Sequence, residues 1–72
     1  MYKEGDIVER TRYSIGMRGK LLHYRGNDSW EVEFTYVPKE VRRKYGYKVG
    51  EQQQWCPVYF KLYKKPTPDW EL

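Results

Sequence analysis

Hydrophobic and polar residues alternate most clearly in the segment that follows the turn-rich sequence RGNDS. Side chains along a β-strand point to opposite faces in turn, so this alternation predicts a strand with one buried face. The residues expected in the core are Trp30, Val32, Phe34 and Tyr36, with Glu31, Glu33 and Thr35 directed outward. A preceding apolar set, Leu21, Leu22 and Tyr24, predicts the partner strand. Together the two segments predict a β-hairpin across RGNDS.

Shorter strands are expected on both sides of this hairpin. The segment GDIVER, residues 5–10, places Ile7 and Val8 among charged residues, as in a short first strand. Near the end of the chain a strand should run through Trp55, and Pro57 should interrupt it because proline has no N–H to donate. A 3₁₀ turn is expected over residues 58–60, followed by a last strand over residues 61–63.

The segments between the strands predict one long loop and one short helix. Gly16 and Gly19 break any period in residues 11–19, which predicts a long, mobile loop closed by Gly19. In PKEVRRKYG, residues 38–46, Pro38 suits a first helical turn and Gly46 suits a left-handed end. Val41 and Tyr45 are four residues apart and lie on one face of a two-turn helix.

Length and composition indicate a single small, mainly β domain. A chain of 72 residues is long enough for one domain, and an aromatic content of 18% is unlike that of disordered segments. We assign residues 1–64 to the domain. Residues 65–72 contain two prolines and few core residues, and we expect an extended or disordered tail.

Several classes of function find little support in the sequence. Cys56 is the only cysteine, which excludes an internal disulfide and suits a reducing, cytoplasmic location, and His23 is the only histidine. We interpret Cys56 as a buried structural thiol and His23 as a half-exposed strand residue. There is no phosphate-loop or zinc-finger spacing and no apolar run of membrane-spanning length. We therefore expect no catalysis, no cofactor or metal site and no membrane association.

The basic residues fall in two blocks. Residues 10–26 contain five basic and no acidic residues, namely Arg10, Arg12, Arg18, Lys20 and Arg25. Residues 39–48 contain five basic residues and Glu40. The strand between these blocks carries acidic residues. Blocks of one sign attract phosphate or acidic protein surfaces, although a solvated basic surface that only confers solubility has the same composition.

The order of these segments resembles that of small Src-homology-3-like (SH3-like) barrels of the KOW and Tudor kind. The resemblance rests on GDIVERTRYSIGMRGKL, then SWEVEF, then WCPVYFKLY, and covers residues 4–63. It implies a barrel of about five antiparallel strands with a 3₁₀ turn before the last strand. The helical insertion at residues 37–50 is longer than such barrels usually have. It either carries the specific activity or covers the end of the barrel as a cap. The chain also resembles small proteins encoded by bacteriophages.

Two binding hypotheses follow, and we favour the first. In the first, the chain is a non-enzymatic module that binds a protein, for example as a phage-type modulator of a host protein. Its contacts would come from residue types common at interface hot spots. These are Arg42, Arg43, Tyr45, Tyr47 and Trp70. Exposed edge strands offer a further place for a partner strand or a second copy, and the sequence leaves the oligomeric state open.

The alternative hypothesis is that the chain binds nucleic acid. Its arginines and lysine would contact phosphates while tyrosines stack on unpaired bases. The residues expected to do so are Arg10, Arg12, Tyr13, Arg18, Lys20 and Arg25, with Tyr24, Tyr45 and Tyr47 as further stacking candidates. A net charge of +4 is small for a dedicated nucleic-acid-binding protein.

Overall fold

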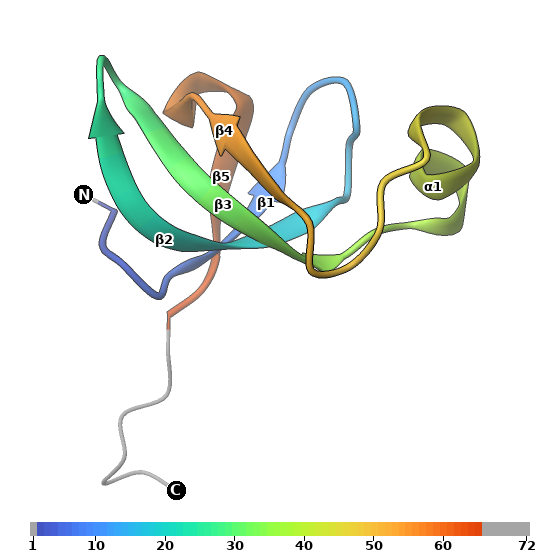
Figure 1. The fold of residues 1–72 in the computed structure, drawn as a ribbon, viewed down its shortest axis with the longest axis horizontal. Coiled ribbons are helices and arrows are strands. Elements are labelled where there is room, and N and C mark those ends of the chain that lie inside the picture. Colours follow the sequence, from blue (N-terminus) through green and yellow to red (C-terminus); the bar gives the residue numbers. More distant parts are fainter. Residues whose placement is uncertain (1, 66–72) are drawn as a thin grey trace, which may run out of the picture.

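The fold is a single antiparallel sheet of five strands with one helix and one 3₁₀ turn (Figure 1). It is known from a computed structural model, which describes residues 2–65. The strands are β1 (Ile7–Arg10), β2 (Arg18–Gly26), β3 (Ser29–Tyr36), β4 (Gln52–Trp55) and β5 (Phe60–Lys64). Helix α1 spans Lys39–Tyr45 and the 3₁₀ turn η1 spans Pro57–Tyr59. The order across the sheet is β4-β3-β2-β1-β5, which confirms the mainly β prediction.

The predicted hairpin is present as β2 and β3. Trp30, Val32 and Phe34 are all buried, as the alternation predicted. The turn passes through Asn27 and Asp28 with φ of 50° and 57°. Positive φ at both central positions matches the right-handed twist of the flanking strands, and Asn and Asp tolerate it better than most residues.

Tyr36 was expected in the core, and that prediction is wrong. Its side chain is 46% exposed. It lies at the end of β3, opposite Arg18, whose guanidinium carbon is 4.7 Å from the centre of the Tyr36 ring. A register shift between Arg18 and Gly19 puts one extra residue into β3 here, so Tyr36 turns to the other face and the next residue, Val37, is buried instead.

A bulge in β2 explains the three apolar residues of the first hairpin strand. Leu21 pairs with Val32 and Tyr24 pairs with Trp30, so β2 uses one residue more than β3 between the two pairs. The extra residue puts Leu21 and Tyr24 on the same face although they are three positions apart. Leu21 is fully buried, whereas Tyr24 is 53% exposed near the open end of the hairpin.

The loop between β1 and β2 is shorter and better packed than expected. Strand β2 already begins at Arg18, so Gly19 lies inside the strand and does not close the loop. Met17 is fully buried and Ser14 is almost so, which ties the loop to the core. Tyr13, at the tip, has φ of 64° and a side chain that is 70% exposed.

Helix α1 begins and ends close to the predicted residues. Pro38 is the N-cap, and Gly46 has φ of 76° at the C-cap, where its N–H donates to the Arg42 carbonyl at 2.8 Å. Val41 is buried, which anchors the helix to the core, but Tyr45 is 39% exposed. In Figure 1 the helix lies to one side of the sheet, away from the β2–β3 turn.

The core joins the middle of the sheet to the segment between β4 and β5. Trp55 at the end of β4 stacks on Phe34 at 5.8 Å, and its ring centre is 6.1 Å from that of Phe60 on β5. The turn η1 lies between Trp55 and Phe60 and starts one residue earlier than predicted. The buried apolar residues are Val8, Met17, Leu21, Trp30, Val32, Phe34, Val37, Val41, Trp55 and Phe60.

The structure describes only the first residue of the predicted tail, residues 65–72. Residues 66–72, which include Trp70 and most of the predicted tail, lie outside the described residues. Lys65, assigned to the tail, forms an ion pair with the buried Asp6 at 3.5 Å. Over residues 2–65, no helix is long and apolar enough to cross a membrane.

Candidate functional site

A hollow of about 520 Å³ opens beside β4 and η1, and four tyrosines form much of its lining. We call it the tyrosine groove and define it by Arg10, Tyr13, Tyr45, Tyr47, Gln53 and Tyr59. Within the part of the chain that the structure describes, no acidic side chain lines this groove. Its surface is therefore aromatic, neutral and cationic in character.

The groove is assembled from segments that are distant in sequence. Arg10 ends β1, Tyr13 belongs to the following loop, and Tyr59 lies in η1. Tyr13 and Tyr59 meet edge to face with ring centres 5.6 Å apart. Tyr45 is the last residue of α1, so the loop, the helix and the 3₁₀ turn each supply one wall.

The left-handed turn at Gly46 brings two of the tyrosines together. Tyr45 and Tyr47, on either side of Gly46, stack with an interplanar angle of 4° and centres 5.4 Å apart. Tyr47 also meets the buried Phe34 edge to face at 5.3 Å. The stacked pair is thus fixed to the core through Tyr47 while Tyr45 remains at the surface.

Among the described residues that line the groove, Arg10 is the only charged one, and its environment is unusual. Its guanidinium carbon lies 5.0 Å from the Trp55 ring centre and 5.5 Å from that of Tyr59. Its Nε atom is buried, and nothing among residues 2–65 accepts a hydrogen bond from it. Burial lowers the pKa of Arg10 from its ordinary value, although the surrounding tyrosines oppose this shift. An arginine remains charged at neutral pH even so, which leaves a cation with an unused donor.

Two consecutive side-chain hydrogen bonds connect residues at the groove. The indole Nε1 of Trp55 donates to Oε1 of Gln53 at 2.8 Å. Nε2 of Gln53 in turn donates to the Tyr47 hydroxyl at 3.4 Å. Cys56 lines the same hollow and is half-buried, so the prediction of a buried thiol is wrong. It follows β4 directly, where the chain turns outward into Pro57.

The groove combines residues from both of the predicted binding sets. Tyr45 and Tyr47 come from the protein-binding set, and Arg10 and Tyr13 come from the nucleic-acid set. Arg42 is not among the lining residues and borders a separate hollow of about 390 Å³ with Lys48 and Val49. Arg43 is exposed on α1, and Trp70 lies outside the described residues.

Two of the remaining nucleic-acid candidates form ion pairs within the fold. Arg18 pairs with Glu9 at 3.1 Å, and its guanidinium carbon is 4.0 Å from the Tyr63 ring centre. Arg25 pairs with Glu31 at 3.3 Å. Arg12 and Lys20 are exposed. Two of the expected phosphate contacts are therefore occupied by carboxylates of the fold itself.

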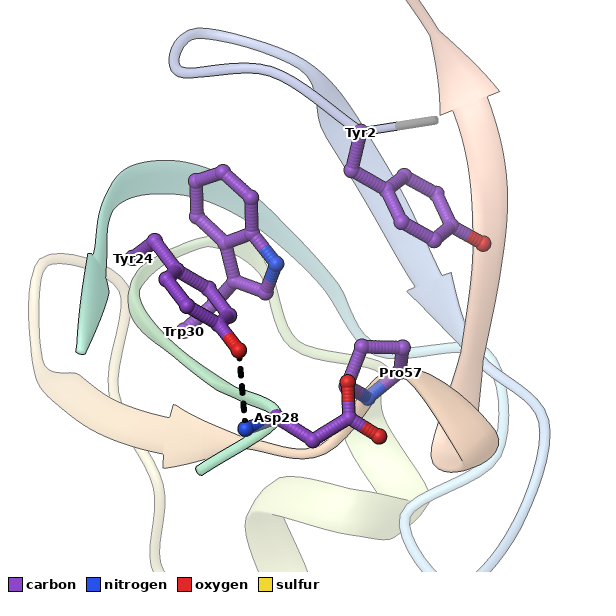
Figure 2. Close-up of a pocket in the computed structure, with 5 residues that line it drawn as sticks. All are labelled: Tyr2, Tyr24, Asp28, Trp30 and Pro57. Carbon is purple, nitrogen blue, oxygen red and sulfur yellow. Dashed lines mark hydrogen bonds between the residues drawn. The ribbon is translucent and has the colours of Figure 1, made fainter. Parts of the chain in front are cut away.

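Sequence reasoning missed three features of the surface. It did not select Tyr59 or Gln53, although an aromatic residue beside Pro57 in a 3₁₀ turn is a signal that could have been used. It also missed a second hollow, of about 570 Å³, lined by Tyr2, Tyr24, Asp28, Trp30 and Pro57 (Figure 2). We call this hollow the Asp28 pocket. The pocket depends on the bulge in β2, because the bulge pairs Tyr24 with Trp30. No pattern in the sequence predicts this bulge.

Comparisons of the chain with models of protein families, with curated proteins and with solved structures give no match. Its class therefore rests on its own architecture. The chain is a small antiparallel β-sheet protein with an aromatic groove on its surface.

Proposed function

We propose that this chain is a non-enzymatic binding module that holds an extended segment of a partner protein in the tyrosine groove. The carboxylate of an acidic residue in that segment accepts hydrogen bonds from Arg10, and neighbouring apolar groups lie on the tyrosine rings. Tyr and Arg supply most of this surface, as they do at the energetic centres of many protein interfaces.

The observation that carries the proposal is the buried Nε of Arg10, which has no hydrogen-bond partner among residues 2–65. A buried donor without a partner costs about 1–3 kcal/mol, so this donor lowers the stability of the free protein. Nε is closed off from solvent, so a ligand carboxylate reaches it after a shift of the guanidinium and then removes this penalty. Trp55 and Tyr59 hold the planar group beside the groove, which limits the entropy lost on association.

An SH3-like barrel is part of the proposal, although the sheet is open within residues 2–65 because its edge strands β4 and β5 do not pair with each other. The sheet order β4-β3-β2-β1-β5 and the 3₁₀ turn between the two edge strands agree with this arrangement. The contact between Trp55 and Phe60 also agrees with it, because it brings the end of β4 close to the start of β5. A modulator of the bacteriophage type, acting on a host protein in the cytoplasm, would suit a domain of this size.

Single-stranded nucleic acid is the alternative ligand, and the parallel stack of Tyr45 and Tyr47 favours it. Aromatic faces of this kind stack on bases, and Arg10 would contact a phosphate. The ion pairs of Arg18 and Arg25 argue against it, because they remove two cations from a surface that needs several. We therefore favour the protein ligand.

Selection of short random peptides on the full chain, with Arg10→Met beside it, tests the proposal. Met keeps the apolar contact with Trp55 and Tyr59 but removes the donors. We expect wild-type selections rich in Asp or Glu next to apolar residues. A selected peptide should bind Arg10→Met about tenfold or more weakly in calorimetry, since a hydrogen bond to a charged group contributes about 1.5–3 kcal/mol.

Arg12→Met is the matched control, because Arg12 is exposed and the change in net charge is the same. We expect it to bind the peptide as the wild type does. The free energy of unfolding of Arg10→Met should differ from the wild-type value by less than about 1 kcal/mol, because relief of desolvation offsets the lost cation–π contact. Equal affinity of Arg10→Met and wild type would contradict the proposal.

A further inference from the structure

We infer that the Asp28 pocket is a second binding site, which takes a basic side chain, lysine or arginine, of a protein segment. Its lining combines three aromatic rings with one carboxylate (Figure 2). Within residues 2–65, Asp28 is the only charged residue of that lining. The pocket is therefore opposite in charge to the tyrosine groove.

The turn between β2 and β3 holds Asp28 in place. The Asp28 N–H donates to the Tyr24 hydroxyl at 2.9 Å, which bridges the turn to the preceding strand. This bond uses the backbone of Asp28 and leaves its carboxylate free. Among residues 2–65 the carboxylate makes no ion pair and accepts no hydrogen bond. A surface carboxylate on a rigid turn costs little to order when a cation arrives.

The aromatic side of the pocket is also firmly held. Trp30 is only 9% exposed and meets Tyr24 edge to face, with ring centres 5.4 Å apart. In Figure 2 the indole nitrogen of Trp30 is turned towards the space between Tyr2 and Pro57. Ring faces attract a cation placed against them, and the indole N–H is a donor for a backbone carbonyl of the same segment.

Other classes of ligand suit this lining less well. An anion would be repelled by the negative charge of the Asp28 carboxylate. A purely apolar group would desolvate that carboxylate without pairing it, which is unfavourable. A metal ion needs several oxygen ligands, and the described residues of the lining offer a single carboxylate. A lysine or arginine side chain satisfies the carboxylate with its charged end and the rings with its methylene stem.

The two sites border the same short segment of chain. Asp28 lines the pocket and the next residue, Ser29, lines the tyrosine groove. Pro57 and Cys56 are divided between the two hollows in the same way. One extended partner segment that carries a basic and an acidic residue would reach both. The cation site is nevertheless testable on its own, because Arg10 does not line it.

The test is an NMR titration of the full chain at low ionic strength with N-acetyl-lysine amide. The indole N–H signal of Trp30, assigned with a Trp30→Phe variant, reports occupancy. We expect a saturable shift of this signal. Asp28→Asn should weaken the binding about fivefold, as expected for loss of an exposed ion pair. Asn accepts the left-handed conformation of the turn as Asp does, so the pocket is retained.

Two controls separate charge recognition from general effects. Glu40→Gln removes an equal charge from α1, away from the pocket, and should bind the probe like the wild type. N-acetyl-norleucine amide, which lacks the ammonium group, should bind more weakly than the lysine probe. Arg10→Met should leave lysine binding unchanged, which distinguishes this site from the groove. Equal binding of the two probes, an unaffected Asp28→Asn variant, or no saturable shift would overturn the inference.

Discussion

Two arginines show how the surroundings of a residue decide its role. Both Arg10 and Arg18 lie against aromatic rings, with guanidinium carbons 4.0–5.5 Å from the ring centres. Arg18 also has Glu9 at 3.1 Å and is satisfied within the fold. Arg10 has no such partner among the described residues, and its Nε is buried. The same residue type thus stabilises the sheet at one position and leaves an unused donor at the other.

Gly19 is required by close packing, which leads to a stability prediction. A Cβ at this position would overlap Cγ1 of Val32 and come within 3.3 Å of both the Glu33 carbonyl oxygen and the Trp55 ring. We expect Gly19→Ala to lower the free energy of unfolding by about 1–3 kcal/mol, the usual cost of overpacking a core. Urea denaturation followed by tryptophan fluorescence measures the change.

Lys20→Ala provides the comparison, since Lys20 is the next residue of β2 and is exposed. Its effect should stay within about 0.5 kcal/mol, as for most surface substitutions. A Gly19→Ala protein as stable as the wild type would mean that the β2–β3 pair has room that the described packing lacks.

At the scale of elements, helix α1 serves mainly to position two tyrosines. It has seven residues, too few to be stable alone, and one buried side chain, Val41. Its C-cap at Gly46 separates Tyr45 from Tyr47 and turns the chain so that the two rings stack. The insertion at residues 37–50 thereby supplies two residues of the groove lining. That these residues contribute to binding is part of the proposed function.

Gly46→Ala tests this coupling between the helix end and the groove. Alanine at φ of 76° is strained, although no atom stands within 4 Å of the added Cβ. We expect a loss of about 1–2 kcal/mol in the free energy of unfolding, the usual cost of the left-handed conformation for a residue with a Cβ. The affinity for a groove peptide should fall as well, because the Tyr45–Tyr47 stack depends on this turn.

Gly46→Asn is the matched variant, since asparagine tolerates the left-handed region better than alanine. It should recover part of both the stability and the affinity. If the alanine and asparagine variants lost affinity equally, strain at the turn would not be the cause.

The elements were easier to predict from the sequence than the sites. Alternation at Trp30, Val32 and Phe34 and the glycine at position 46 are local signals, and local signals determine strands and helix ends. The groove forms because the fold brings Arg10, Tyr13, Tyr47 and Tyr59 together from distant segments of the chain. No local sequence pattern predicts that contact. The sequence analysis accordingly divided Arg10, Tyr13 and Tyr47 between two hypotheses and did not select Tyr59. The bulge that places Tyr24 beside Trp30 is likewise set by pairing across strands.

At the scale of the whole molecule, three of the 14 basic residues form ion pairs, which leave the net charge at +4 but reduce the number of free cations. Arg18, Arg25 and Lys65 are engaged with Glu9, Glu31 and Asp6, respectively. The exposed basic residues Arg12 and Lys20 are separate from the groove, as judged from its lining. A polyanion in the groove would therefore meet Arg10 and, beside Tyr45, Lys44, whose Nζ is 5.4 Å from the Tyr45 ring centre.

This distribution predicts how binding depends on salt. Each phosphate contact to a single strand contributes about −0.7 to the slope of log K against log salt. With few free cations near the groove, we expect a fluorescent oligothymidine to bind weakly and with a slope shallower than about −2. A groove peptide, held by one charged contact and several rings, should lose less than tenfold in affinity between about 50 and 200 mM salt, because contacts with apolar rings are not screened. Fluorescence anisotropy measures both series. Tight oligonucleotide binding with a steep slope that Arg12→Met made shallower would favour the nucleic-acid hypothesis instead, since it would require the surface cations to act together on phosphates.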